Sequence, residues 1–364
     1  MNAAIQKTAV LLLLLGLGVL LRRRFIKPEA LGGLKELILT VALPSTIFIA
    51  LMKVQLNSSL VFVPLLTLAF NLLVFFLVPL LFPLVGLEKN SAAGRTLLLL
   101  IPSLAPGLSC FPFIAEFLGE KDLALAALAD VGNKFFVLIF LYVIALNMYL
   151  GNGDEVEVNT AGRVRHLFLS LFREPVNGVI VMAMILLACG LHYGSLPPVI
   201  TDFMDKTSGL MTPLVLIYIG LAVQWKEGRK KLVMSVLLFR AGSSLLISAA
   251  MILLFHIRAH NLVLLAVVIP LSSASFWPLA HITAFHQREN RKGLSREQRS
   301  FDPELAVLLL AFSLPFSSLL ILGILSAGNV FTHPLTLVVT GLLFIIAGAL
   351  PFLFARGHRY PKTG

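Results

Sequence analysis

Apolar stretches separated by short polar gaps follow one another along the whole chain. Most of them contain the roughly 17–25 residues that a helix needs to cross a bilayer. Eleven segments can be marked, at about 5–21, 35–52, 61–85, 96–118, 123–149, 174–194, 207–225, 232–255, 262–285, 304–326 and 335–355. Because no polar gap exceeds about twenty residues, the pattern predicts an all-α polytopic membrane protein without a separate aqueous domain.

The composition agrees with this class of protein. The 364 residues are 58% hydrophobic and only 13% charged, with a mean hydropathy of +0.94, whereas soluble domains carry about 25% charged residues. Cys110 and Cys189 both lie in apolar segments, which argues against a disulfide framework or a metal cluster. We therefore expect no metal or other cofactor.

The basic residues alternate between the two ends of the segments. Of the 29 lysines and arginines, 21 lie in the odd-numbered gaps and the C-terminal tail, five at the N-terminus and in the even-numbered gaps, and three inside segments. Because basic loops stay cytoplasmic, we expect the N-terminus outside and the C-terminus inside the cell (inner) membrane. Residues 22–24 are arginines that follow the first apolar run, so that run is predicted to be a retained helix.

The net charge of +11 raises nucleic-acid binding as an alternative. The basic clusters are short, each abuts the end of a segment, and together they build no domain, so we do not expect nucleic acid as a partner. The longest basic loop, 286–300, is interpreted as a determinant of topology. Contact with anionic membrane lipid is the alternative for this loop.

Two segments are interrupted near their middle. In the fourth, residues 101–112 (IPSLAPGLSCFP) contain three prolines, which no regular helix can pass through. In the ninth, residues 269–278 (IPLSSASFWP) are again rich in proline and serine. Breaks at membrane depth are tolerated where the freed backbone lines a cavity or packs within the protein. The pair of breaks is typical of a transporter's binding site, and two merely kinked helices are the alternative.

The breaks take matching places in two sets of five segments. The second segment of each set carries a proline (Pro44 and Pro213), and the fourth carries the serine-rich break. An odd number of crossings makes the second set start from the opposite side, which is an inverted repeat. We therefore predict a 5+5 inverted-repeat core of ten helices, with helices 4 and 9 broken, plus an additional C-terminal helix 11.

Four stretches resemble the auxin efflux carrier family of permeases. Residues 18–51 (GVLLRRRFIKPEALGGLKELILTVALPSTIFIAL) are similar to its first helix hairpin. Residues 105–140 (APGLSCFPFIAEFLGEKDLALAALADVGNKFFVLIF) are similar to its fourth and fifth helices. Residues 212–223 (TPLVLIYIGLAV) look like the seventh helix and 301–306 (FDPELA) like the start of the tenth. The resemblance covers about residues 5–326.

The resemblance implies a ten-helix fold like that of bile acid–sodium symporters, in which helices 4 and 9 break and cross beside the substrate. It implies a carrier core at 1–326, followed by an appended helix with a cytoplasmic tail at 327–364. Within the core, scaffold helices are expected at about 5–52 and 174–225, and transport helices at about 61–149 and 232–326. The chain departs from the family at residues 105–107, where Ala-Pro-Gly replaces the usual Asn-Thr-Gly. Its loop before Phe301 is longer and more basic, and its eleventh segment is additional.

Candidate substrate-binding residues lie at the two breaks. The N-terminus of a half-helix carries free N–H groups and a partial positive charge, both of which suit a carboxylate. Serine hydroxyls there would add further hydrogen-bond donors. The predicted substrate-binding residues are therefore Pro106, Gly107, Ser109, Ser272, Ser273 and Ser275.

Charged residues inside the segments are costly unless they are paired or functional. Asp130 and Lys134 are spaced i, i+4, so they can pair on one helix face, and Asn133 can join them. We interpret this group as a proton or substrate-anion relay, with a self-neutralising structural pair as the alternative. The family resemblance supports Asp130 and Asn133, through Asp-x-Gly-Asn, but not Lys134. Arg240 is interpreted as a counter-ion for the substrate or a partner of Asp130 or Glu116, with a structural snorkelling arginine as the alternative.

The leading functional hypothesis is a secondary transporter, or permease, for a small organic anion or weak acid. A proton gradient or the membrane potential would drive it, and sodium coupling stays open because unwound carbonyls can coordinate an ion. The sequence contains no Walker-type glycine-rich loop and no HExxH spacing, so neither a primary pump nor an enzyme is expected. A sensor or scaffold without transport activity is the alternative. Substrate identity, direction of transport and homodimer formation are left open.

Overall fold

The computed structural model of the protein is all-helical, with no strand among the residues that it describes. These are residues 3–25, 28–53, 62–151, 162, 165, 169, 175–222, 229–294 and 298–357. Within these residues, six helices are long and apolar enough to cross a membrane, at Glu29–Met52, Phe62–Val85, Glu120–Leu150, Lys230–Leu254, Pro303–Ser326 and Pro334–Leu353. Two shorter apolar helices cover Gln6–Leu21 and Pro175–Ala188. The prediction of an all-helical protein is confirmed, and these helices have the length and composition of membrane-spanning helices.

Helical elements occupy all eleven predicted segments. The first half of the chain forms α1 (Ala3–Leu21), α2 (Pro28–Leu37), η1 (Ile38–Ala42), α3 (Leu43–Met52), α4 (Phe62–Leu77), η3 (Val78–Val85), α5 (Ala92–Leu100), α6 (Pro106–Ser109), α7 (Phe111–Phe117), α8 (Glu120–Phe135), η4 (Phe136–Phe140) and α9 (Leu141–Leu150). The second half forms α11 (Pro175–Ala188), η5 (Tyr193–Ser195), α12 (Pro198–Ser208), α13 (Met211–Ala222), α14 (Lys230–Leu254), α15 (His260–Val268), α16 (Trp277–Arg291), α17 (Pro303–Ser326), η7 (Gly328–Thr332) and α18 (Pro334–Gly357). Eleven membrane crossings remain a prediction, because six helices in the described part of the chain are both long and apolar enough to span a membrane.

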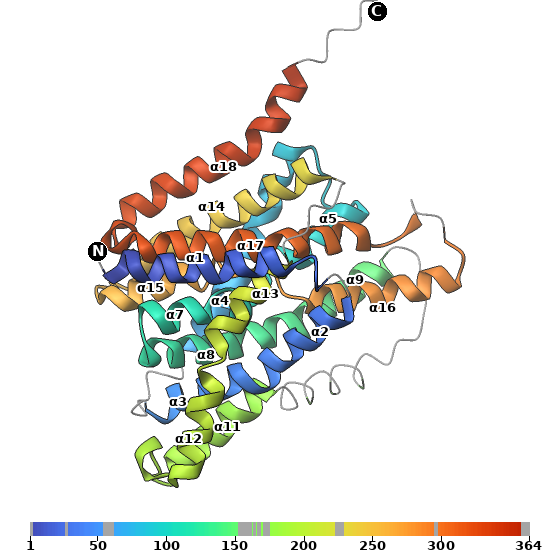
Figure 1. Ribbon diagram of the computed structural model, residues 1–364. Coiled ribbons are helices and arrows are strands. Elements are labelled where there is room, and N and C mark those ends of the chain that lie inside the picture. Colours follow the sequence, from blue (N-terminus) through green and yellow to red (C-terminus); the bar gives the residue numbers. More distant parts are fainter. Residues whose placement is uncertain are drawn as a thin grey trace, which may run out of the picture.

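The last helix, α18, lies along the outer face of α14, and α11 and α12 lie at the opposite edge of the molecule (Figure 1). Glycines bring α14 and α18 into backbone contact. A Cβ added to Gly242 would lie 2.6 Å from the carbonyl oxygen of Gly341, and one added to Gly341 would lie 2.9 Å from that of Gly242. Small residues permit such close packing between membrane helices, so the appended helix is an integral part of the bundle.

The two interrupted segments meet inside the bundle, between α5 and α6 and between α15 and α16. We call the unwound residues 101–105 and 269–276 the crossover. Their backbones touch directly, because the Ala105 N–H donates to the Ser273 carbonyl at 2.8 Å, which forms the isolated bridge of the chain. The helix interruptions predicted from the prolines are therefore confirmed.

The segment 299–302 ties together the ends of α5 and α16 that lie away from the crossover. Arg95 donates from Nε to the Ser300 carbonyl at 2.7 Å, and Glu289 accepts the Ser300 N–H at 2.8 Å. The Asp302 N–H donates to Thr96 Oγ1 at 2.8 Å. Burial lowers the pKa of Arg95, and the Glu289 carboxylate partly offsets this effect. The end of the basic loop 286–300 therefore has a structural role that its charge pattern does not reveal.

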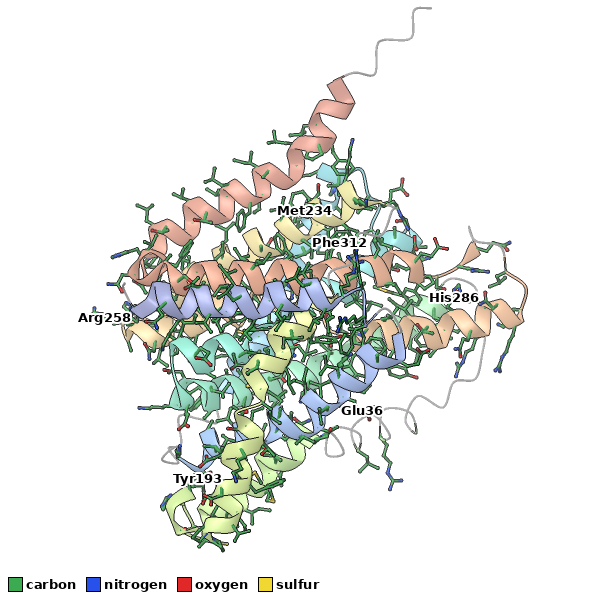
Figure 2. The ribbon with its side chains drawn as sticks, viewed as in Figure 1. Glu36, Tyr193, Met234, Arg258, His286 and Phe312 are labelled. Atoms are coloured by element: carbon green, nitrogen blue, oxygen red, sulfur yellow. The ribbon has the colours of Figure 1, made fainter. Side chains whose placement is uncertain are left out.

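Figure 2 shows Arg258 and His286 at opposite ends of the molecule. The alternation of basic residues predicts that the end with His286 is cytoplasmic. We expect Asn290→Cys, on the exposed side of α16, to react with a membrane-impermeant maleimide only after the inner face is opened. The background is Cys189→Ser, since Cys189 is exposed and Cys110 is buried.

Arg258→Cys provides the matched control for this topology prediction, because it should react in intact cells. Reaction at position 290 in intact cells, or protection of position 258, would contradict the predicted orientation.

Candidate functional site

A cavity of about 600 Å³ adjoins the crossover. Both unwound stretches contribute to its wall, through Ala105 and through Ser273 to Phe276. Further lining residues come from α2, η1, α3, α8, α11, α13 and α17. The volume falls within the roughly 300–1,000 Å³ of small-molecule sites. The cavity is therefore large enough for a small organic molecule and lies where the sequence predicts a binding site.

Serine side chains join the two halves of the crossover. Ser109 Oγ accepts the Ser273 N–H at 2.8 Å and donates to the Ala105 carbonyl at 2.8 Å. Ser103 Oγ accepts the Ser275 N–H at 3.0 Å. These bonds satisfy backbone groups that an interrupted helix leaves without partners, so the serines stabilise the break itself.

Asn133 of α8 supports the first half of the crossover from behind. Its side-chain amide pairs with the backbone of Leu104, accepting the N–H at 3.1 Å and donating to the carbonyl at 2.8 Å. The same oxygen accepts a bond from Asn71 of α4 at 3.1 Å. Asn133 is 1% exposed. A side-chain amide thus replaces the helical partners that residue 104 lacks.

The predicted pair of Asp130 and Lys134 forms as expected. Lys134 Nζ lies 3.6 Å from Asp130 Oδ2 and donates to Asn177 Oδ1 of α11 at 3.2 Å. Asp130 Oδ1 accepts a bond from Asn133 at 2.8 Å. Asp130, Asn133 and Lys134 all line the cavity. A titratable carboxylate, an amide and a cation are therefore held at the cavity wall and connected to the crossover.

Arg240 of α14 binds backbone carbonyls of the crossover. Its guanidinium donates from Nε to the Ile101 carbonyl at 2.8 Å and from Nη2 to the Ser103 carbonyl at 2.9 Å. It is 3% exposed and lies outside the cavity lining. The carbonyls released at the break therefore supply negative dipoles that compensate the Arg240 charge. Its role as a substrate counter-ion, or as a partner of Asp130 or Glu116, stays a prediction.

The crossover residues divide into two groups. Pro106, Gly107, Ser273 and Ser275 line the cavity as predicted, whereas Ser109 and Ser272 do not. Ser272 Oγ donates to the Ile269 carbonyl at 2.7 Å, and Ser109 bridges the two backbones. Both hydroxyls complete backbone hydrogen bonds, and their contact with substrate stays a prediction.

The sequence reasoning missed several residues that line the cavity. They include Lys35 of α2, Tyr218 of α13, and Phe276 and Trp277 at the start of α16. Lys35 stood out only as a charge within a segment, and the aromatic residues carried no signal. Asn71 of α4 and Asn177 of α11 make interhelix hydrogen bonds to Asn133 and Lys134 of α8.

A second cavity, of about 680 Å³, lies near the opposite ends of α3 and α13. Its lining includes Lys7 of α1, Thr46 of α3, Glu116 of α7 and Met211 of α13. Both cavities are bounded by α3 and α13 and by the α6–α8 region. The two cavities therefore share bounding helices, and one of them adjoins the crossover.

No family model and no curated protein matches the chain.

We expect Ser109→Ala to lower the thermal midpoint in detergent, because it removes the acceptor of the buried Ser273 N–H. An unsatisfied buried donor costs about 1–3 kcal/mol. Ser272→Ala is the matched control, since the Ile269 carbonyl keeps the Ser272 N–H as a donor at 3.1 Å. Equal midpoints for the two variants would show that the serine bridge contributes nothing to stability.

Proposed function

We propose that the protein is a secondary transporter that carries a small organic anion or weak acid across the membrane by alternating access. One observation carries the proposal: two unwound helix breaks pair with each other beside a cavity that contains a buried Asp130–Lys134 pair. Unwound backbone at membrane depth is typical of transporter binding sites. Membrane-embedded ionisable residues are expensive and are retained mainly for function.

The position of the cavities supports this proposal. One adjoins the crossover, and the other is lined by residues of α1, α3, α7, α8 and α13. Alternating access requires space beside a fixed central site that can open to either side of the membrane. The cavity at the crossover is bounded by Leu39, Leu43, Leu310 and Leu314. Polar groups lie at the crossover, on α8 and, through Lys35, Glu36 and Thr40, on α2 and η1. An amphipathic ligand with one polar end fits such a lining.

We further propose that α1–α9 and α11–α17 are the two inverted repeats, each with a broken fourth segment, and that the protein is related to auxin efflux carriers. The proposal is supported by the sequence resemblance and by matching interruptions at 101–105 and 269–276. The family usually has an asparagine at its first break, where this chain has Ala105. We propose that Asn133, whose side-chain amide binds the backbone of Leu104, supplies the amide contact instead.

Uptake into reconstituted vesicles tests the proposed function. Purified protein is placed in vesicles with an imposed proton gradient, and labelled mono- and dicarboxylates and aromatic acids are added outside. Saturable uptake of at least one acid, abolished by dissipating the gradient, is expected. Absence of both uptake and exchange for every acid, by protein that binds one of them, would instead favour a sensor or scaffold.

A further inference from the structure

We propose that Lys35 holds the anionic group of the ligand in the crossover cavity, and that the ligand carries an aromatic or apolar body that lies against Phe276 and Trp277. The inference rests on the proposed function, because it names the ligand class of that same site. It assigns anion recognition to a residue of α2, outside the two helix breaks.

Lys35 is a cation that projects into the cavity from α2. Its ammonium lies 5.1 Å from the centroid of the Phe276 ring, and both residues line the cavity. Glu36 also lines the cavity, yet within the described part of the chain no ion pair joins Lys35 to this or any other carboxylate. The Lys35 charge is thus stabilised by an aromatic face, a modest interaction, and remains available to an anion.

The other cations of the bundle interior are committed elsewhere. Lys134 is paired with Asp130 and bonded to Asn177. Arg240 is bound to the carbonyls of residues 101 and 103. Since each already has a partner within the protein, recruiting either for a ligand would break an existing buried contact. Lys35 is the cavity residue that can take up an anion without such a loss.

The surroundings of Lys35 define the rest of the ligand. Phe276 and Trp277 stand at the start of α16, a fifteen-residue helix whose N-terminal turn carries a partial positive charge. Tyr218 and the cavity leucines add an apolar wall. An anion at Lys35 would therefore have its carboxylate near Phe276, over whose ring the ammonium lies, and its apolar body along the wall. An aromatic or branched monocarboxylate has this shape and polarity.

Trp277 provides a fluorescent reporter inside the site. The chain has two tryptophans, so Trp225→Phe leaves Trp277 as the single emitter in the full-length protein in detergent. We expect Lys35→Gln to reduce quenching by iodide about twofold while leaving quenching by neutral acrylamide unchanged, because only the anion is concentrated by the Lys35 charge. Unchanged iodide quenching would overturn the inference.

Lys53 supplies the matched control. Its ammonium also lies 5.1 Å above an aromatic ring, that of Tyr193, but it is paired with Glu120 outside the cavity. Lys53→Gln should therefore leave both kinds of quenching unchanged. A fall in iodide quenching equal to that of Lys35→Gln would mean that overall charge, and not this site, controls the anion.

Ligand binding is measured by the quenching of Trp277 fluorescence on addition of 4-nitrophenylacetic acid, which is a carboxylate at neutral pH, or of its uncharged amide. The carboxylate should bind at least tenfold more tightly than the amide, and Lys35→Gln should remove that preference while Lys35→Arg retains most of it. Equal binding of carboxylate and amide, or no carboxylate binding at all, would overturn the inference.

If binding behaves as expected but no acid is transported in vesicles, the proposed function fails and the site stands. If transport occurs with an unchanged KM in Lys35→Gln, the site fails and transport stands.

Discussion

Replacing Arg240 by methionine is expected to destabilise the protein strongly. The guanidinium donates two buried hydrogen bonds, at 2.8 and 2.9 Å, to carbonyls of residues 101 and 103 that lie beyond the end of α5. Each buried carbonyl left without its donor costs about 1–3 kcal/mol, and bonds from charged donors lie at the upper end of that range. We therefore expect a loss of roughly 2–5 kcal/mol in the free energy of unfolding.

Cys110 reports this loss at the crossover itself. Its thiol is buried and lies 3.5 Å from the Val268 carbonyl, between the two interrupted helices. Both proteins carry Cys189→Ser. A thiol-reactive dye should label Cys110 at a markedly lower temperature in the Arg240→Met variant than in the protein that keeps Arg240. Arg240→Lys should recover part of the difference, because a single ammonium can reach one of the two carbonyls but lacks the planar fork of arginine.

Arg258→Met, which changes an arginine at one end of the molecule (Figure 2), is the control and should leave the labelling midpoint unchanged. If Arg240→Met matched this control, the guanidinium would not be holding the crossover, and the role of substrate counter-ion would be favoured instead.

The sequence was sufficient to predict the interruptions and the polar pair, because both follow from local chemistry. Prolines 102, 106, 270 and 278 exclude a continuous helix wherever they fall. The i, i+4 spacing of Asp130 and Lys134 fixes their neighbourhood before any tertiary contact is known. Their separation of 3.6 Å follows from helical geometry.

The partners of the break could not be predicted in this way. Arg240 is separated by 137 residues from Ser103, and Ser273 by 164 from Ser109. Nothing in the spacing of such distant residues indicates which carbonyl meets which donor. A serine beside a proline equally suits a ligand contact or a backbone hydrogen bond. Only the packing of α14 and α16 against α5 decides between them.

Lys35 illustrates a second limit of pattern reasoning. It lies at the edge of an apolar segment, where lysines usually direct their charge toward the membrane surface. The structure directs its ammonium over Phe276, a residue 241 positions later in the chain. The cavity therefore combines residues that separate sequence motifs would never associate.

Asp130→Asn is expected to abolish gradient-driven uptake while leaving exchange of labelled for unlabelled substrate. Asp130 lines the cavity, accepts a hydrogen bond from Asn133 and faces Lys134 at 3.6 Å. It can therefore gain or lose a proton as the ligand comes and goes. Asparagine keeps the shape and the hydrogen bond but cannot carry the proton. We expect uptake against a gradient to fall at least tenfold, with exchange retained to within about twofold, measured in vesicles with an acid that the wild-type protein transports.

Asp122→Asn is the matched control for this experiment. Asp122 lies on the same helix, is 6% exposed like Asp130, and accepts a hydrogen bond from Asn261 at 2.6 Å, but it does not line the cavity. Its replacement should leave coupled uptake intact, which separates a coupling role from the general cost of losing a buried carboxylate.

The double variant Asp130→Asn/Lys134→Met distinguishes coupling from structure. Removing both charges should destabilise the protein less than removing one, because a lone buried charge is left uncompensated. If the pair only neutralises itself, the double variant should therefore still accumulate substrate. If Asp130 carries the coupling proton, the double variant should be as stable as the wild type or more so and still fail to accumulate substrate. We expect the second outcome. Full gradient-driven uptake by well-folded Asp130→Asn would assign the pair a structural role and place the coupling site elsewhere.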